Sequence, residues 1–539
     1  MILVRNGTIV DGTGKPAFVG DVLVEGDKIK EIYPSSVHLQ PSTFNLQPST
    51  FNLPPSPDDE VVDATGLVVS PGFIDAHTHS DAYLVLEPDA PSKVTQGITT
   101  EINGQCGGSV APRSGEARLS SDWAALLGEK LTWRSLAEYR EVLAAAKPAV
   151  NTVQFVGHNT LRSSVVGYAA RAATPEDLSE MQRLLAQSLD EGGWGLTTGL
   201  IYQPGKYSTP DEVVALAKVA AEKGGYYATH MRSEGDRILE AIDEVIDLVK
   251  ATGIRAEISH LKTSGRKNWH KIDAVLDKIE TAMSAGLLLG SDRYPYCAAG
   301  TDLDVVLPDW AQVGAAPAET KRLADASLRA RIVDEINALD RDWSTVMIGG
   351  TWAPENKPFS GKTVAEILAA DGNRRQSTAG ELIASILLAD GCKTGAFFFG
   401  MSEENLAKIY SRPWIVPGSD ASLRAPWGPL GADHPHPRAY ATMPEFYRRV
   451  RALGFSREET VARMTGAVAD RFGIRGRGRI EKGAYADLVV WNESEFKAKA
   501  TFDEPHRFTG GVKAVMTNGV VCWQDGRFTG KRGGRFLER

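Results

Sequence analysis

The chain has 539 residues, of which 42% are hydrophobic and 24% are charged. Both fractions are close to the averages of globular proteins, so they exclude disorder as the dominant state. The 60 Lys and Arg against 68 Asp and Glu give a formal net charge of −8. Because no long basic run accompanies this acidic balance, we expect no nucleic-acid partner.

The cysteines and the apolar segments indicate the cellular compartment. The 4 cysteines are far apart and show none of the paired spacings of a disulfide framework. The first residues, MILVRNGTIVDGTG, lack the basic and long apolar regions of a signal peptide. No window reaches the ~18 apolar residues of a membrane span. We therefore expect a cytoplasmic protein with no membrane partner.

Both ends of the chain contain short segments typical of β-strands. Residues 1–35, 486–492 and 512–528 mix β-branched residues with Asn-Gly and Asp-Gly turns. Each end is too small to bury a core alone, so we expect residues 1–65 and 476–539 to pair into one small β-sandwich. The basic residues 531–539 are expected to form a solvated end.

A short repeat interrupts the first of these ends. The sequence LQPSTFN occupies residues 39–45 and again 46–52. Two copies of a seven-residue period are too few for a solenoid or a coiled coil. The Pro, Ser and Thr content indicates an extended or disordered loop over residues 38–59, without a function of its own.

The middle of the chain, residues 66–475, alternates apolar runs with helical segments such as TPEDLSEMQRLLAQSLDEG. This alternation predicts a parallel α/β sheet. Eight runs qualify as strands: 68–77, 99–106, 152–158, 193–199, 226–230, 255–260, 287–292 and 414–420. Eight strands close a (β/α)8 TIM-like barrel, which is the fold class that we predict.

Two further apolar runs, residues 345–351 and 395–401, exceed this count. They lie between the seventh and eighth predicted strands, and we assign residues of about 298–412 to an inserted subdomain beside the barrel mouth. The alternative is that one of the two runs belongs to the barrel and displaces a strand.

Candidate metal ligands stand at the carboxyl ends of five predicted strands, where barrel enzymes build their sites. His77 and His79 end the first strand, and alternation points both imidazoles to the same side. The other strand ends carry Cys106, His230, His260 and Asp420. A single such residue is weak evidence, because a buried Cys or His is often part of the core. Six ligand-type residues at the same barrel face together predict a metal site.

At these residues the chain resembles the amidohydrolase superfamily and, within it, the N-acyl-D-amino-acid deacylases, or D-aminoacylases. The resemblance covers nearly the whole chain and includes the segments PGFIDAHTHSD, QGITTEINGQCGGSVAP, VGHNTLR, GLTTGLIYQPG, ATHMRSE, ISHLK, SDRYPY and GRIEKGAYADLVVWN. It implies a metal-dependent barrel, a β-sandwich made by both chain ends, and hydrolysis of N-acylated D-amino acids. One departure is Gly107-Gly108-Ser109 after Cys106, where these deacylases usually have Gly-Ile-Ser.

The resemblance also implies the roles of the six ligands. A tightly held zinc ion would be bound by Cys106, His230 and His260. A second, weaker position would be lined by His77, His79 and Asp420 and would share Cys106. Thiolate and imidazole are ligands that zinc favours. Asp420 would act as the catalytic general base, taking a proton from water and delivering it to the leaving nitrogen.

Further residues are expected around the substrate, a small N-acyl amino acid. The resemblance places Tyr202 and Lys262 on its α-carboxylate, and Arg293 is a third candidate for the same role. His158, at the end of the third strand, is either a hydrogen-bonding residue behind the ligands or a direct participant. His434 and His436 are expected in the wall of the barrel mouth.

Two alternatives remain open. A cyclic-amide hydrolase of the dihydroorotase or hydantoinase kind shares the His-x-His pair, two later histidines and the final Asp, but it bridges two metals with a modified lysine. None of the predicted strands ends in lysine. A non-catalytic scaffold on the same fold would have lost ligands. The preferred side chain, the acyl group and the oligomeric state are not predictable from the sequence.

Overall fold

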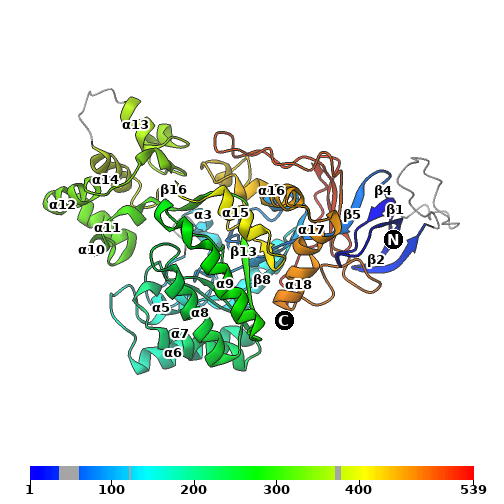
Figure 1. Cartoon of the computed structure of the whole chain (residues 1–539), viewed down its shortest axis with the longest axis horizontal. Coiled ribbons are helices and arrows are strands. Elements are labelled where there is room, and N and C mark those ends of the chain that lie inside the picture. The colour runs from blue at the N-terminus through cyan, green and yellow to red at the C-terminus, as the bar shows by residue number, and fades with distance from the viewer. Residues whose placement is uncertain (36–59, 120–122, 371–377) are drawn as a thin grey trace.

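The computed structural model describes residues 1–35, 60–119, 123–370 and 378–539, so the LQPSTFN repeat lies outside the described residues. Figure 1 shows three parts: helices α10–α14 on one side, the barrel in the middle, and the strands near the N-terminus on the other side. In the described part of the chain, no helix is both long and apolar enough to cross a membrane.

The barrel contains the eight predicted strands. They are β6 (Phe73–Asp75), β7 (Ile98–Asn103), β8 (Asn151–Gln154) continued by β9 (Val156–Gly157), β10 (Gly195–Gly199), β11 (Tyr226–His230), β12 (Arg255–Ile258), β13 (Leu289–Arg293) and β17 (Ile415–Pro417). The ring closes where the Ala76 amide donates to the Pro417 carbonyl over 3.2 Å and Thr78 bridges to Ala421. The predicted barrel is confirmed, although its first run is divided, because β5 (Val68–Pro71) belongs to another sheet.

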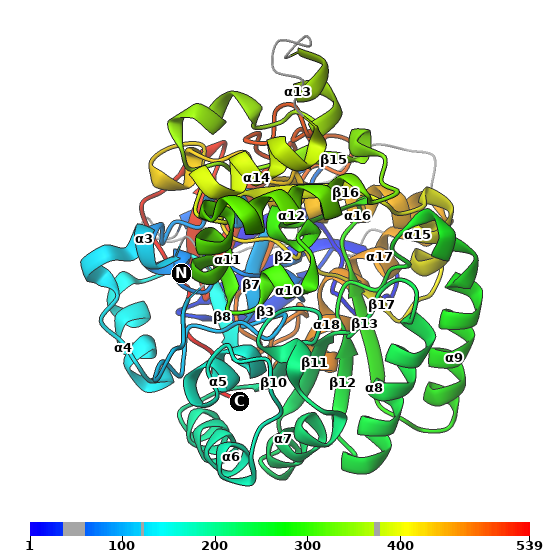
Figure 2. The same ribbon diagram turned by 90° about the vertical axis from the view of Figure 1, so that its left-hand side faces the viewer.

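The outer helices follow the strands in sequence (Figure 2). They are α5 (His158–Val165), α6 (Pro175–Asp190), α7 (Pro210–Glu222), α8 (Ile238–Thr252) and α9 (Ile272–Ser284). Helix α6 begins at a capping box in which Thr174 and Asp177 bond each other's backbone amides. Helix α8 buries Ile238, Ile242, Val245 and Val249, spaced to form one apolar face.

The shorter helices lie in the connections and after the barrel. They are α1 (Tyr83–Leu86), α2 (Pro91–Val94), α3 (Trp123–Leu127), α4 (Leu136–Ala146), α15 (Glu403–Tyr410), α16 (Arg438–Ala452), α17 (Arg457–Met464) and α18 (Gly466–Phe472). Helices α1 and α3 and the start of α16 contribute residues to the barrel mouth, among them Tyr83, Trp123 and Arg438.

The two chain ends share one continuous nine-stranded sheet. Its strands are β1 (Ile2–Ile9), β2 (Phe18–Glu25), β3 (Lys28–Pro34), β4 (Glu60–Asp63), β5, β18 (Leu488–Trp491), β19 (Val512–Thr517), β20 (Val520–Gln524) and β21 (Arg527–Phe528). The sheet curls, since the Ile29 amide donates to Ala484 and the Ala486 amide to Asp27. Side chains from both ends, such as Val22 and Met516, meet in one apolar cluster.

Between β13 and β17 the chain forms a layer with its own core. Strands β14 (Ala298–Asp302), β15 (Val346–Ile348) and β16 (Gly395–Phe399) form a three-stranded sheet, packed with α10 (Asp309–Gln312), α11 (Ala315–Ala324), α12 (Ala326–Asn337), α13 (Val364–Ala370) and α14 (Ala379–Ala389). The two extra apolar runs of the sequence are therefore β15 and β16, which pair with each other. Strand β16 also pairs with β14, and the three strands form a sheet separate from the barrel.

The C-terminal residues differ from the solvated end expected from their charge. The Leu537 amide donates to the Thr152 carbonyl, and the Thr152 amide donates to the Arg535 carbonyl. Leu537 is buried in a cluster with Phe155 and Trp194 at the amino end of the barrel. Main-chain pairing and one buried leucine hold this segment in place, and a charge count does not detect either.

Candidate metal centre

The structure brings all six predicted ligands together at the carboxyl end of the barrel. The Cys106 sulfur lies 3.3 Å from Nε2 of His77, 3.4 Å from Nε2 of His260 and 3.8 Å from Nδ1 of His230. Two groups of ligand atoms result, each within 4.8 Å: Cys106 with His230 and His260, and Cys106 with His77, His79 and Asp420. The thiol is the member that both groups share.

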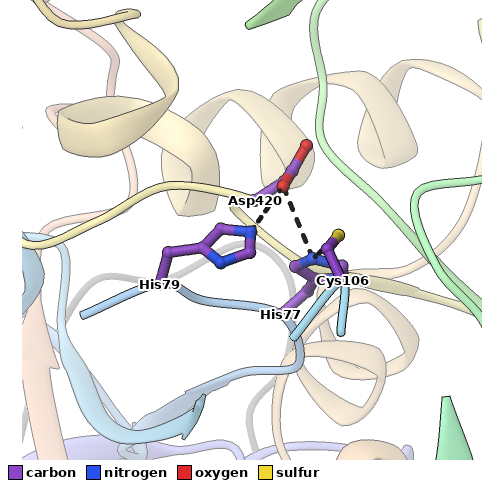
Figure 3. Close-up of side chains that lie close together, drawn as sticks. All are labelled: His77, His79, Cys106 and Asp420. Carbon is purple, nitrogen blue, oxygen red and sulfur yellow. Dashed lines mark hydrogen bonds and ion pairs between the residues drawn. The ribbon is translucent and has the colours of Figure 1, made fainter. Parts of the chain in front are cut away.

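Asp420 completes the second group from the neighbouring strand end, because β17 lies beside β6 and the Asp420 amide donates to the His77 carbonyl over 2.8 Å. Its Oδ1 is 3.1 Å from Nε2 of His79 and 3.4 Å from Nε2 of His77, as Figure 3 shows. Its Oδ2 is 2.8 Å from Nη1 of Arg438. One oxygen therefore faces the imidazoles and the other faces a guanidinium.

Three of the ligands stand on left-handed backbone. The φ angles of Cys106, His260 and Asp420 are 51°, 39° and 49°, in a region that residues other than glycine rarely adopt. Around Cys106 the neighbouring chain is close, because a Cβ added at Gly199 would lie 2.1 Å from the Cys106 carbonyl oxygen. Such conformations persist only where the surroundings impose them, and they concentrate at functional sites.

The electrostatics of the cluster favour anionic ligands. Burial raises the pKa of the Cys106 thiol, but the imidazoles of His77 and His260 outweigh burial and bring it well below its ordinary value. Burial also raises the pKa of Asp420, but Arg438 and His260 hold it well below the usual range. The same charges act in return on His260, whose pKa is raised to about 9 against the effect of burial.

This donor set fits a zinc ion. A thiolate with two imidazoles, and a second set of two imidazoles with a carboxylate, are ligand types that zinc prefers. Cationic imidazoles around Cys106 and Asp420 compensate the same negative charge that a bound divalent cation would compensate.

Two buried carboxylates behind the ligands were not predicted. Oδ2 of Asp292 is 3.2 Å from Nδ1 of His77, and its Oδ1 accepts from the His260 amide over 3.0 Å. Oε1 of Glu234 is 2.9 Å from Nδ1 of His260. Carboxylates in such positions fix the orientation of a ligating imidazole and raise its basicity.

The predicted substrate residues occupy different surroundings. The Tyr202 ring lies 4.8 Å from the His230 ring and lines the central cavity. The Lys262 ammonium is buried, pairs with Glu234 and lies 2.7 Å from Nδ1 of His260. Lys262 therefore contacts a predicted ligand directly.

Two other predicted residues do not join the site. Arg293 and Lys262 are both buried and neither lines the cavity. Unlike Lys262, Arg293 contacts no predicted ligand and donates to the Tyr296 carbonyl over 2.7 Å, so we no longer assign it to the substrate. Nε2 of His158 is 2.8 Å from Oε1 of Glu212 on α7, so its partner lies outside the group of six ligands. The His158 side chain thus faces α7, whereas the Arg293 guanidinium lies against Tyr296 and Met401, in the segments that follow β13 and β16.

A cavity of about 570 Å³ opens above the ligands. The barrel side of its lining includes His79, Cys106, Asp420 and Arg438, and the β14–β16 layer contributes residues such as Trp352 and Phe397. His434 and His436 also line it, where the sequence placed them. Arg438 was missed, although it directly follows the His-Pro-His-Pro segment.

The fold and the ligand set are those of amidohydrolases, and the family comparison agrees. Residues 60–522 match the model of the amidohydrolase family, so the chain belongs to this family.

Relatives of known activity cover the whole chain. The D-aminoacylase of Alcaligenes xylosoxydans xylosoxydans is 32% identical over 100% of this chain and 97% of its own. The structure of a D-aminoacylase with a binuclear metal centre shares 31% sequence identity with this chain, and the two folds match with a TM-score of 0.80. The N-acyl-D-glutamate deacylase of Bordetella bronchiseptica, solved with zinc and a phosphonate mimic of the tetrahedral intermediate, is 30% identical with a TM-score of 0.80; both structures cover 99% or more of each chain. The resemblance to deacylases is confirmed.

Proposed function

We propose that this protein is a zinc-dependent hydrolase that cleaves the amide bond of N-acyl-D-amino acids into a carboxylate and a D-amino acid. The observation that carries the proposal is the Cys106 thiol shared by two ligand groups, with the Asp420 carboxylate in the second of these groups. Full-length similarity to three deacylases of D-amino acids supports the substrate class.

Cys106, His230 and His260 would hold the tightly bound zinc ion. His77, His79 and Asp420, with the shared Cys106, would hold a weaker second ion. When bound, zinc supplies Lewis-acid polarisation of the substrate carbonyl. Asp292 and Glu234 keep the imidazoles of His77 and His260 in position.

Asp420 is the group that moves the proton. Its Oδ1 faces the ligand cluster, so it is placed to take a proton from the attacking water and to deliver it to the leaving nitrogen. The Arg438 guanidinium forms an ion pair with Oδ2 over 2.8 Å, and its charge lowers the pKa of Asp420, which favours the ionised carboxylate.

Tyr202 and Lys262 are proposed to bind the α-carboxylate of the substrate. Burial and the nearby Cys106 charge raise the pKa of the Tyr202 hydroxyl well above its ordinary value, so it stays protonated and can donate. The Lys262 ammonium already pairs with Glu234, which makes its role the less direct of the two.

The cyclic-amide alternative requires a modified lysine between the metals. The shared ligand of this cluster is a thiol, and the buried Lys93 near the first strand pairs with Asp75. Intact mass spectrometry for a carbon dioxide adduct on lysine distinguishes the two classes. The scaffold alternative is opposed by the presence of all six ligands.

The test is turnover of N-acetyl-D-methionine, N-acetyl-D-glutamate and N-acetyl-D-aspartate by the purified protein with zinc, with the L-enantiomers as controls. Hydrolysis of at least one D-substrate over its enantiomer is expected. No turnover of any of the three, or an equal rate on both enantiomers, contradicts the proposal.

We also propose a cytoplasmic location. None of the 4 cysteines is in a disulfide, which suits a reducing compartment.

A further inference from the structure

Gln105 directly precedes the shared thiol Cys106 and is buried, with 1% of its surface exposed. It lines the central cavity. Neither its Oε1 nor its Nε2 has a hydrogen-bond partner among the described residues. A buried amide without a protein partner is costly, and one beside a metal centre is available to a polar group of a bound molecule.

The cavity lining contributed by α1 and α3 is apolar, and Arg424, which also lines the cavity, stacks on Tyr83 at 5.0 Å from the ring centroid. Tyr83 of α1 and Trp123 of α3 pack edge to face with ring centroids 5.9 Å apart. Leu126 of α3 and Leu430 extend the same wall, and all four residues line the cavity. The lining contributed by the β14–β16 layer mixes polar residues, such as Thr301, Asp302 and Lys393, with the aromatic residues Trp352 and Phe397.

The order of the strands shows which part of a substrate reaches this wall. Gln105 follows β7, whereas Lys262 follows β12, four strands away in a ring of eight and therefore on the far side. In an N-acyl amino acid, the α-carboxylate and the acyl chain lie on opposite sides of the scissile bond. A substrate whose carboxylate lies toward Tyr202 and Lys262 consequently directs its acyl chain toward Gln105.

We propose that this wall is an acyl-binding subsite for apolar acyl chains longer than acetyl. The subsite consists of Gln105, Tyr83, Trp123, Leu126 and Leu430. Nε2 of Gln105 donates a hydrogen bond to the acyl carbonyl oxygen, and the other four side chains contact the hydrocarbon chain. The proposal rests on the proposed deacylase function and adds the class of acyl group.

The experiment measures kcat/KM for N-formyl, N-acetyl, N-butyryl and N-hexanoyl derivatives of one D-amino acid. In the wild type, kcat/KM should rise about 3- to 4-fold for each methylene group that becomes buried. Trp123→Ala should flatten this rise. Leu126→Trp, at a half-buried position where folding is less at risk, should abolish the gain beyond acetyl by filling the space.

Gln105→Leu isolates the hydrogen bond. Because every substrate in the series has the same carbonyl, this variant should lower kcat/KM by roughly 2- to 10-fold at every chain length. The dependence on chain length should stay as in the wild type. A loss confined to the long chains would show that Gln105 packs against the hydrocarbon and does not bind the carbonyl.

Trp352→Ala is the matched control, because Trp352 lines the same cavity from the β14–β16 layer. It should leave the chain-length profile unchanged. A wild type that hydrolyses the acetyl substrate but shows no rise with length overturns the subsite alone. The subsite is also overturned if Trp352→Ala flattens the profile as much as Trp123→Ala does. Absence of all hydrolysis would overturn the proposed function instead.

Discussion

Three ligands of the proposed metal centre, Cys106, His260 and Asp420, hold left-handed backbone at the ends of β7, β12 and β17. Each such conformation costs on the order of 1 kcal/mol or more, which the packed barrel offsets. The strain turns each side chain inward where its strand ends. A role of these side chains is therefore best tested with a replacement residue that tolerates left-handed backbone. Asparagine is one of the few such residues.

Asp420→Asn removes the proton acceptor and retains both shape and backbone conformation. Turnover should fall by roughly 10²-fold or more, on the scale of lost general-base catalysis. Steady-state kinetics measures the fall, and circular dichroism with metal analysis checks that fold and tight metal persist. Near-normal turnover in this variant would refute the assignment.

The shared thiol predicts an asymmetry in metal binding. Cys106→Ala should lose both ions on dialysis, because the thiol belongs to both ligand groups. His79→Asn should retain about one tight zinc ion, since His79 belongs only to the weaker group. Elemental analysis of the dialysed proteins measures the zinc content of each variant. Equal metal content in both variants would contradict the division into a tight and a weak position.

Lys262→Met tests whether the lysine reads the substrate's carboxylate. A charge-assisted hydrogen bond contributes roughly 1.5–3 kcal/mol, so kcat/KM on free-acid substrates should fall about 10- to 200-fold. The matching substrate amide has no carboxylate and should be affected less. Equal losses on acid and amide would instead assign Lys262 to support of His260, with which it is in contact.

At the level of elements, the first, second and last strands of the barrel are joined by one buried lysine. Nζ of Lys93, on α2, lies 3.0 Å from Oδ2 of Asp75 on β6 and 3.1 Å from Oε1 of Glu101 on β7. It also donates to the Ser419 hydroxyl over 3.1 Å, directly before Asp420. All of these side chains are fully buried, and they fix the seam of the barrel beside the ligands.

Lys93→Met should therefore destabilise the protein strongly. Removing the lysine leaves the carboxylates of Asp75 and Glu101 buried without their cation, a change that costs about 3–5 kcal/mol. Denaturant unfolding measures the loss. Lys278→Met is the control, because its ion pair with Asp243 is exposed and should change stability by about 1 kcal/mol or less. Comparable losses in the two variants would show that the seam does not depend on Lys93.

The sequence was sufficient for the barrel and for its ligand types, because both follow from local patterns. Strand ends place side chains at one face, and residues such as His77 and His79 alternate within a single run. The supporting carboxylates could not be found this way. Asp292 meets His77 across a separation of 215 residues, and only the closed ring brings them together. For the same reason the partner of His158 was not predictable, since Glu212 lies on a later helix.

The whole molecule contains separate apolar cores, and the layer between β13 and β17 has one of its own. Leu303, Ile332, Ile348 and Leu387 are fully buried in it. The layer therefore has its own contribution to stability. It also lines one side of the central cavity.

A buried pair of carboxyl groups, Asp304 and Glu319, makes that stability depend on pH. Burial and the adjacent Asp304 raise the pKa of Glu319 to about 9, while Arg322 opposes the shift only in part. The unfolded chain loses this proton near the ordinary value of about 4.5, whereas the folded layer keeps it. Folded protein thus binds more protons between these values, and stability falls as the pH rises through that window.

Glu319→Gln should remove much of this decline, because the amide retains the shape of the protonated acid and cannot ionise. The variant should match the wild type near pH 5 and exceed its stability at pH 8–9 by about 1–3 kcal/mol, the scale of an uncompensated buried polar group. Calorimetry at pH 5, 7 and 9 measures the difference. Asp334→Asn, at an exposed position of α12 in the same layer, is the control and should keep the wild-type pH dependence. Parallel pH profiles for wild type and Glu319→Gln would show that Glu319 does not retain its proton in the folded layer.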